Sequence, residues 1–370
     1  MRVLHFFKTY HPDTFGGVER TIHAIARSTA PLGVETTVLS LSRDPQSSPA
    51  TFSGHRLIKA RLDLDIASTG LSREAFALFR DAAQEADIVH YHFPWPFMDL
   101  VHFASRHGKP SLVTYHSDIV KQRMLKRLYA PLMHRFLGSA DRIVATSPGY
   151  IETSPVLSRY REKVSLVPIG LDTADYPRPA PEAVERWRNA YTRPMFVFSG
   201  VLRYYKGLHV LVAAAKAVNA EIVIIGKGPM EAELLRQAEN SGARNIHFVG
   251  AIDDEEKMAA LSAASGFVFP ATQRSEAFGL ALLEGAMAGL PLVSTELGTG
   301  TSFVNLDGVS GIVVPPDNPE ALAAAMNTII DNDTLAARFG AGARDRFETL
   351  FTASAMGQSY LRIYEKLLSR

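Results

Sequence analysis

Short runs of β-branched and aromatic residues alternate with longer stretches of helical periodicity along all 370 residues of the chain. Strands that are nearly continuous in apolar residues and are separated by helices form parallel sheets covered on both faces. The pattern therefore predicts an α/β protein with two doubly wound domains. The expected strands are 3–7, 37–41, 88–91, 111–115, 142–146 and 164–168, then 195–200, 221–226, 246–250, 266–270, 291–294 and 311–315. The expected helices of the first half are 17–32, 73–86, 119–138 and 148–158.

The boundary between the domains is expected in residues 168–181, which hold four prolines and one glycine without periodicity. Proline removes a backbone donor and fixes φ, so this stretch predicts an extended linker. We expect one domain over 1–178 and a second over 179–352, with a returning C-terminal helix in 353–370. Ligands of doubly wound sheets bind at the carboxyl ends of strands, so a cleft between two facing domains is the expected site.

Composition excludes several classes of protein. Cysteine is absent, so there is no disulfide framework, thiolate metal site or cysteine nucleophile. No apolar run approaches the ~18 residues of a membrane span, and the N-terminal apolar run is too short for a signal peptide, so we expect a cytoplasmic protein. Residues 1–178 carry 22 basic and 17 acidic residues, and the remainder 17 and 21. A basic half indicates contact with an anion such as a phosphate or a lipid surface.

The segment 274–289, RSEAFGLALLEGAMAG, follows an expected strand and carries two glutamates eight residues apart. We expect its helix to begin near Phe278, with Glu276 in the preceding loop and Glu284 in the second turn. First-turn amides have no partner within a helix and lie at its positive end, where they bind anions or hydroxyls. Those amides belong to Phe278, Gly279 and Leu280. On spacing alone, a capping Glu276 and a surface Glu284 are equally acceptable.

The segment 200–207, GVLRYYKG, also follows an expected strand. Arg203 and Lys206 fall where phosphates bind in such folds, and a guanidinium fork beside an ammonium group suits a diphosphate. Two solvated surface cations are the alternative.

The loop after the first strand contains Gly16 and Gly17 directly before a helix, so the backbone there can approach a ligand closely. The dinucleotide pattern GxGxxG is absent from this loop, and the chain has no GxxxxGK[ST] sequence. These absences argue against a nicotinamide or flavin site in the first half and against a P-loop NTPase.

His116 ends the strand SLVTYH, where its ring can bond a sugar hydroxyl. His90 and His92 alternate along one strand face, and no third ligand stands at a recognisable spacing, so we assign them to packing and expect no metal. The pair Asp63 and Asp65 matches a DxD string but is expected in a loop away from the phosphate loops.

Residues 119–136 combine apolar residues at helical spacing with five basic ones, namely Lys121, Arg123, Lys126, Arg127 and Arg135. A basic amphipathic helix can lie on an anionic membrane surface. An ordinary helix that covers its sheet with a charged outer face fits equally well.

Taken together, these motifs resemble the retaining glycosyltransferases of family 4, which have the GT-B fold of two facing Rossmann-like domains. The resemblance covers essentially the whole chain and is strongest in the E-x7-E segment with its Phe-Gly pair. Several segments look like bacterial mannosyl- and rhamnosyltransferases of O-antigen synthesis: KTYHPDTFGGVE, YHFPWPFMD, TYHSDIVKQ, VLRYYKGL, RSEAFG and GTGTSF. The resemblance implies a GDP-linked sugar donor, a polyprenyl-diphosphate-linked glycan acceptor and work at the inner face of the plasma membrane, with no nucleic-acid partner.

The resemblance also implies roles for individual residues. Gly17 lies near the donor diphosphate, and His116 bonds a hydroxyl of the transferred sugar. Arg203 and Lys206 neutralise the departing phosphates. Glu276 holds sugar hydroxyls beside the helix-end amides, and Glu284 accepts from the ribose. Many family members have an arginine directly after the glycine that matches Gly200, where this chain has Val201.

The implied reaction needs no metal and no other cofactor, and it proceeds with retention by front-face attack. A UDP-sugar transferase, a phosphorylase or an epimerase of the same fold is the alternative among enzymes. A non-catalytic sugar-nucleotide-binding protein of a polysaccharide assembly complex is the alternative outside them.

Overall fold

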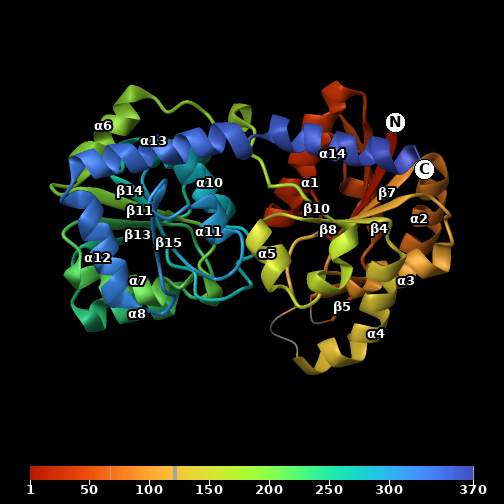
Figure 1. Ribbon diagram of the computed structural model, residues 1–370, viewed down its shortest axis with the longest axis horizontal. Coiled ribbons are helices and arrows are strands. Elements are labelled where there is room, and N and C mark those ends of the chain that lie inside the picture. The colour runs from red at the N-terminus through yellow and green to blue at the C-terminus, as the bar shows by residue number, and fades with distance from the viewer. Residues whose placement is uncertain (67, 120–122, 370) are drawn as a thin grey trace. The chain divides into compact units, whose positions relative to one another are not determined.

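The computed structural model describes residues 1–66, 68–119 and 123–369 (Figure 1). It divides into two compact units, the first being Met1–Gly170 with the C-terminal segment from Ala353, and the second Leu171–Thr352. The expected boundary was residue 178. The unit boundary comes earlier because the amide of Leu171 donates to the carbonyl of Phe351, at 2.9 Å, and ties the start of the linker to the second unit.

The first unit is built on an eight-stranded sheet of order β10-β9-β8-β7-β1-β2-β4-β3. All neighbours are parallel except β3, which runs antiparallel to β4. A separate antiparallel pair joins β5 and β6. The strands are β1 (Arg2–Phe6), β2 (Glu35–Ser42), β3 (Thr51–Phe52), β4 (His55–Arg61), β5 (Leu64–Ile66), β6 (Thr69–Leu71), β7 (Ile88–Phe93), β8 (Ser111–Tyr115), β9 (Arg142–Ala145) and β10 (Val164–Leu166).

Helices cover both faces of this sheet. Phe6 of β1 contacts Phe79 of α2, whereas the adjacent His5 points to the other face, where α14 packs along α1 and reaches β7 (Figure 1). The helices are α1 (Gly17–Thr29), α2 (Glu74–Glu85), α3 (Pro96–Ser105), α4 (Arg123–Ser139), α5 (Pro148–Thr153) and α14 (Ala353–Leu368), with 3-10 turns at Ala30–Leu32, Pro45–Ser47 and Leu157–Lys163.

The second unit holds a six-stranded parallel sheet of order β13-β12-β11-β14-β15-β16. This is the order of a doubly wound nucleotide-binding fold, and it reverses between β11 and β14. The strands are β11 (Met195–Ser199), β12 (Glu221–Ile225), β13 (Ile246–Gly250), β14 (Gly266–Phe269), β15 (Leu292–Thr295) and β16 (Gly311–Val314). The helices are α6 (Pro181–Ala190), α7 (Leu208–Ala214), α8 (Glu231–Ser241), α9 (Asp254–Ala263), α10 (Leu280–Met287), α11 (Thr301–Val304), α12 (Pro319–Ile330) and α13 (Asp333–Leu350), with 3-10 turns at Thr173–Asp175, Tyr204–Lys206 and Ala215–Ala217.

All twelve expected strands are present to within two residues, whereas β3 to β6 and α3 were not predicted from the sequence. The expected helix 17–32 ends at Thr29 because Pro31 enters a 3-10 turn, and 148–158 breaks at Thr153. Of the expected helix 119–138, residues 120–122 lie outside the described residues and α4 begins at Arg123. In the part of the chain that the structure describes, no helix is both long enough and apolar enough to cross a bilayer.

The core of the first unit contains histidines on the sheet face toward α14. His5 of β1 and both His90 and His92 of β7 are completely buried. The ring of His90 bonds the hydroxyl of Tyr364 in α14 at 2.8 Å and that of Thr114 in β8 at 2.7 Å. Burial lowers the pKa of His5 to about 3 and the pKa values of His90 and His92 well below the usual 6.5. These rings are therefore neutral in the folded protein.

We predict that Gly357→Ala lowers the free energy of unfolding of the first unit by about 1–3 kcal/mol. A Cβ at this buried position of α14 would lie 2.7 Å from the side chain of Ser28, so the two helices must move apart. Gly138 of α4 is the matched control, because its Cβ would meet nothing within 4 Å and Gly138→Ala should be neutral or slightly stabilising. Urea unfolding followed by the fluorescence of Trp95, in a Trp187→Phe background, measures both. Equal effects of the two variants would contradict this packing.

We also predict that the first unit loses stability as the pH falls below about 6.5. The unfolded chain binds protons on histidines that the folded chain keeps neutral, so the free energy of unfolding falls by up to about 1.4 kcal/mol per pH unit for each. For His5 the window runs from about 6.5 to about 3. The same fluorescence titration at pH 7.5, 6.5 and 5.5 measures the slope, and His5→Asn should make it shallower. An unchanged slope in the variant would be inconsistent with this explanation.

Candidate active site

Two loops of the second unit leave the carboxyl ends of β11 and β14, the neighbouring strands between which the strand order reverses. Lys206 lies in the loop after β11 and Glu276 in the loop after β14, as the sequence predicted. Lys206 Nζ lies 2.5 Å from Glu276 Oε2, and the two side chains are only 13% and 10% exposed. The ammonium group also lies 4.6 Å from the centre of the Phe269 ring. The fold thus brings the two predicted residues together as a nearly buried ion pair.

Backbone contacts hold the Lys206 loop against the end of β14. The amide of Thr272 donates to the carbonyl of Tyr205 at 3.0 Å. Gly207 has a φ of +68°, and a Cβ there would overlap the carbonyl oxygen of Pro270. Only glycine satisfies both the conformation and the space, which explains the Lys-Gly pair and fixes where Lys206 projects.

Glu276 joins the ion pair to the start of α10. Its Oε1 accepts a hydrogen bond from the amide of Gly279 at 3.0 Å, while Oε2 faces Lys206. The expectation that the Gly279 amide is unpaired is therefore wrong, because the Glu276 carboxylate caps this helix end. Among the described residues, the amides of Phe278 and Leu280 have no protein acceptor. The helix begins at Leu280, two residues later than expected, so the Leu280 amide is the first-turn donor at the positive end of α10, whereas the Phe278 amide lies one residue before the cap.

Glu284 is a buried residue of the second turn of α10, only 5% exposed, so the surface alternative is wrong. Its Oε1 accepts from Lys257 Nζ at 3.0 Å and from the Tyr176 hydroxyl at 3.2 Å. Its Oε2 accepts from the Ser199 hydroxyl at 3.1 Å. None of these three partners was predicted from the sequence. Ser199 is the last residue of β11, within the expected strand 195–200, and was within reach of prediction, whereas Lys257 and Tyr176 carry no local signal.

Arg203 stands apart from the pair. It is exposed, and no hydrogen bond or ion pair within the described ranges holds its guanidinium group. Burial and the charge of Glu276 raise the pKa of the Tyr205 hydroxyl, and the positive charge of Arg203 partly opposes them. Arg203 is therefore close enough to contribute to the local potential while its side chain stays in solvent.

Gly16 and Gly17 lie at the start of α1 in the first unit, Gly16 as the residue that precedes the helix and Gly17 as its first residue. A Cβ on Gly16 would overlap the carboxylate of Glu19. That carboxylate is buried and accepts from the hydroxyls of Thr9 at 2.7 Å and Thr14 at 2.8 Å. Because Gly16 has no side chain, the carboxylate of Glu19 can lie against the N-terminus of α1. Glu19 was not predicted from the sequence.

His116 follows β8 and is 9% exposed. Its Nε2 lies 2.9 Å from Nδ1 of His92, and Nε2 of His92 lies 2.9 Å from Nδ1 of His5. Burial lowers the pKa of His116 to about 3, so the ring is neutral. A neutral imidazole offers one N–H donor and one acceptor and can bond a hydroxyl without bringing charge into the site.

The buried histidines also supply the third imidazole that spacing did not reveal. One ring nitrogen each of His5, His90 and His92 lies within 4.8 Å of the others. Both ring nitrogens of His90 and of His92 already have hydrogen-bond partners, which supports the packing interpretation.

The DxD string is divided between a loop and a strand: Asp63 accepts from the amide of Arg73 at 2.7 Å, and Asp65 is exposed in β5.

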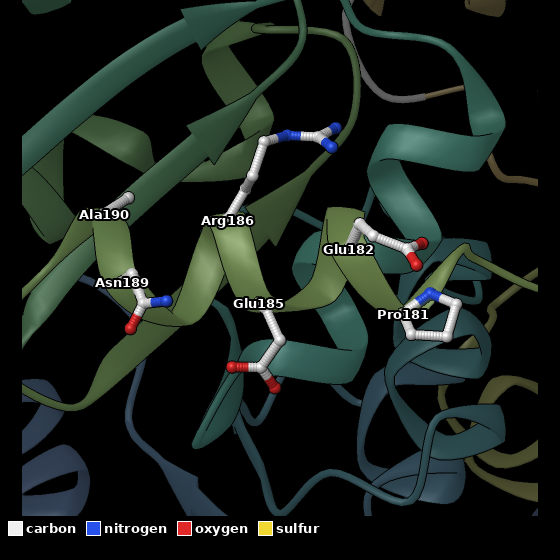
Figure 2. Close-up of a pocket in the computed structure, with 6 residues that line it drawn as sticks. All are labelled: Pro181, Glu182, Glu185, Arg186, Asn189 and Ala190. Carbon is white, nitrogen blue, oxygen red and sulfur yellow. The ribbon is translucent and has the colours of Figure 1, made fainter.

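A hollow of about 750 Å³ lies against α6, and none of the predicted site residues lines it (Figure 2). All six lining residues come from this one helix, and Figure 2 shows their side chains pointing in different directions. Ligand sites need polar groups that converge, so this hollow is not the candidate site.

Comparison with known proteins identifies the chain. Residues 15–175 match the family model described as Glycosyltransferase Family 4, and residues 181–346 match Glycosyl transferases group 1. The D-rhamnosyltransferase WbpZ of Pseudomonas aeruginosa is 52% identical over 353 residues, 95% of this chain and 93% of the relative. The O-antigen chain mannosyltransferase C of Escherichia coli is 44% identical over 368 residues, 100% of this chain and 99% of the relative.

Solved structures show the same fold. The sucrose-phosphate synthase of Thermosynechococcus elongatus superposes with a TM-score of 0.78 at 22% identity, over 100% of this chain and 99% of that one. HepE of Anabaena, solved in complex with UDP, gives 0.78 at 18% identity, over 99% and 100%. Both family models match in order along the chain, and the two relatives align over nearly the whole of it. The chain therefore belongs to the family-4 glycosyltransferases with the GT-B fold.

Proposed function

We propose that this glycosyltransferase is a retaining enzyme that transfers mannose or D-rhamnose from a GDP-sugar to a polyprenyl-diphosphate-linked glycan in O-antigen synthesis. The observation that carries the donor site is the Lys206–Glu276 pair at the strand-order reversal of the second unit. The choice of sugar rests on the names of the two relatives that match nearly the whole chain.

The positive groups around Lys206 suit the departing diphosphate. Breaking the bond between the anomeric carbon and the diphosphate places negative charge on the leaving oxygen. Lys206, the exposed Arg203 and the free amides of Phe278 and Leu280 stabilise that charge, an effect worth several kcal/mol when water is excluded. Glu276 keeps Lys206 in place before the donor binds. With phosphate beside Lys206, the carboxylate becomes an acceptor for sugar hydroxyls.

Glu284 suits the ribose of the donor. Its two oxygens hold the hydroxyls of Ser199 and Tyr176 in the ligand-free protein, so they already lie where hydroxyl donors converge. A ribose diol replaces one or both of these hydroxyls, while Lys257 balances the carboxylate charge. In the first unit we assign Gly16 and Gly17 to the diphosphate through their backbone, and His116 to a hydroxyl of the transferred sugar.

The proposed reaction proceeds by front-face attack. An acceptor hydroxyl oxygen bonds the anomeric carbon as the bond from that carbon to the phosphate oxygen breaks, and the hydroxyl proton passes to the leaving phosphate. Both carboxylates of the site are already engaged, Glu276 with Lys206 and the Gly279 amide, and Glu284 with three donors. Neither is therefore assigned as a covalent nucleophile. Lysine, arginine and amide groups supply the positive charge, so we propose that no metal is required.

Because the proposed acceptor is anchored in the membrane by its lipid, we propose that the enzyme works at the cytoplasmic face of the plasma membrane as a peripheral protein. Arg127 of α4 is exposed, and the neighbouring Leu128 is 81% exposed, an arrangement that combines charge with an apolar contact. Basic residues near an anionic bilayer contribute about 1 kcal/mol each. We propose that α4 is the surface that contacts the lipid.

We predict that the purified protein converts GDP-mannose or GDP-D-rhamnose and a lipid-linked glycan into a longer glycolipid. Lys206→Ala and Glu276→Ala should each lower turnover by at least about 100-fold, because the phosphate loses its cation or the cation loses its position. Both variants should stay folded at the assay temperature, although each leaves one nearly buried charge without its partner and should lower the melting temperature. Lys216→Ala, an exposed lysine of the same unit, is the matched control and should retain full activity.

Three results would count against this proposal. Near-normal turnover in both site variants would remove the donor site. Stabilisation of the protein by UDP or ADP but not GDP would change the donor base. Donor binding without turnover, across several donors and acceptors, would favour a non-catalytic role in polysaccharide assembly.

For the membrane contact, we predict that Lys126→Glu with Arg127→Glu reduces sedimentation with vesicles rich in phosphatidylglycerol by at least tenfold in partition coefficient. Arg73→Glu with Arg80→Glu changes the net charge equally at exposed positions around α2 and should bind as the wild type does. Equal losses in the two double variants would show a non-specific charge effect instead of a contact through α4.

A further inference from the structure

A row of three hydrogen-bonded imidazoles runs through the core of the first unit and ends at His116. His5 is in β1, His92 in β7, and His116 follows β8, so three neighbouring strands each contribute one ring. The two ring-to-ring hydrogen bonds are both 2.9 Å long. The backbone amide of His116 also donates to the carbonyl of Phe93 at 3.0 Å, which fixes the backbone at the His116 end of the row of imidazoles.

The directions of these hydrogen bonds are coupled. A neutral imidazole carries one N–H and one lone pair, so a ring that donates at one nitrogen must accept at the other. Burial keeps the rings neutral. In a row of three neutral rings only two arrangements therefore satisfy both bonds, and they differ in which nitrogen of every ring carries the hydrogen.

The ring of His5, at the inner end of the row, determines which of the two arrangements of hydrogens occurs. Nε2 of His5 is buried and has no hydrogen-bond partner in the described structure. If Nε2 carried the hydrogen, a buried N–H donor would remain unpaired, which folded proteins very rarely tolerate. The hydrogen of His5 therefore lies on Nδ1 and donates to Nε2 of His92. His92 then donates from Nδ1 to Nε2 of His116, which leaves the N–H of His116 on Nδ1.

A fourth ring holds the row in place without joining it. His90 stacks against His92, with ring centres 4.5 Å apart, and its centre lies 4.5 Å from that of His5. Its own nitrogens bond Tyr364 and Thr114, and Thr114 bonds Tyr360, both tyrosines being in the C-terminal helix α14. His90 thus restricts the rotation of the neighbouring rings while leaving the direction of their bonds to His5.

We propose that His5 and His92 are positioning residues that hold His116 in the tautomer with the hydrogen on Nδ1. His116 then presents a fixed N–H donor to a hydroxyl oxygen of the donor sugar, an assignment that rests on the proposed function. A hydroxyl that accepts from His116 keeps its own hydrogen free to donate to an acceptor such as a carboxylate. The tautomer thereby sets the direction of hydrogen bonding around that hydroxyl.

The first experiment reads the tautomer in the ligand-free enzyme. Protein labelled with ¹⁵N-histidine is studied by two-bond proton–nitrogen correlation, and His116→Ala and His92→Ala assign the signals. The expected spectrum shows a protonated Nδ1 and a bare Nε2 for His116 and for His92. A protonated Nε2 of His116, a mixture of tautomers, or stoichiometric metal bound at these rings in the purified protein would overturn the proposal.

The second experiment uses two variants of His5. Asparagine offers an N–H donor near the position of Nδ1, whereas aspartate offers only acceptor oxygens there. We expect the His5→Asp carboxylate to accept from Nε2 of His92, which reverses both hydrogen bonds, moves the hydrogen of His116 to Nε2 and raises KM for the donor sugar by about tenfold, with a smaller change in kcat. His5→Asn should keep the hydrogen of His116 on Nδ1 and KM within about twofold of the wild type. Equal losses in both variants would indicate a merely structural role and overturn the proposal.

The two experiments separate this inference from the proposed function. A fixed tautomer combined with a donor KM that is insensitive to His116→Ala would overturn the assignment of His116 to the sugar. A mixed tautomer in an otherwise active enzyme would overturn the positioning by His5 and His92 and leave the donor site at Lys206 untouched.

Discussion

Parallel strands joined by right-handed crossovers impose the constraint on which both units depend. Where the strand order reverses, the two neighbouring connections leave toward opposite faces of the sheet, and the carboxyl ends of the two strands remain uncovered. In the second unit this point lies between β11 and β14 and holds Lys206 and Glu276. In the first unit it lies between β1 and β7, from which His5 and His92 lead to His116. The candidate groups of each unit thus gather at the one place where the topology leaves room.

Two nearly buried lysine–glutamate pairs distinguish the second unit. The side chains of Lys206 and Glu276 are 13% and 10% exposed, and those of Lys257 and Glu284 are 9% and 6% exposed. Removing such charges from water costs several kcal/mol per ion, and apolar residues of similar size often stabilise a fold equally well. This cost supports the proposal that the two pairs serve the donor site. A cation already held by a carboxylate needs little rearrangement when a phosphate arrives.

The sequence allowed prediction of what depends on local periodicity. The twelve expected strands, the C-terminal helix and the positions of Lys206, Glu276 and Glu284 follow from apolar patterns and from loops placed after strands. The partners of these residues do not, because Ser199 and Lys257 reach Glu284 only through the strand order and the packing of α9. His5 was missed as a third imidazole for the same reason. Strand β4, HRLIKAR, was missed because its charged residues interrupt the apolar run, although His55 and Lys59 are buried.

The histidines of the first unit raise the question of why polar rings occupy a core position at all. Leucine at both position 5 and position 92 would fill similar space, would not titrate and would remove the unpaired Nε2 of His5. Each ring also makes the fold less stable in acid, since its protonated form is excluded from the core. A fold that keeps a hydrogen-bonded row of three rings at this cost retains a property that apolar packing cannot supply. That property is the direction of the ring-to-ring hydrogen bonds, which the buried Nε2 of His5 sets and His92 passes on to His116.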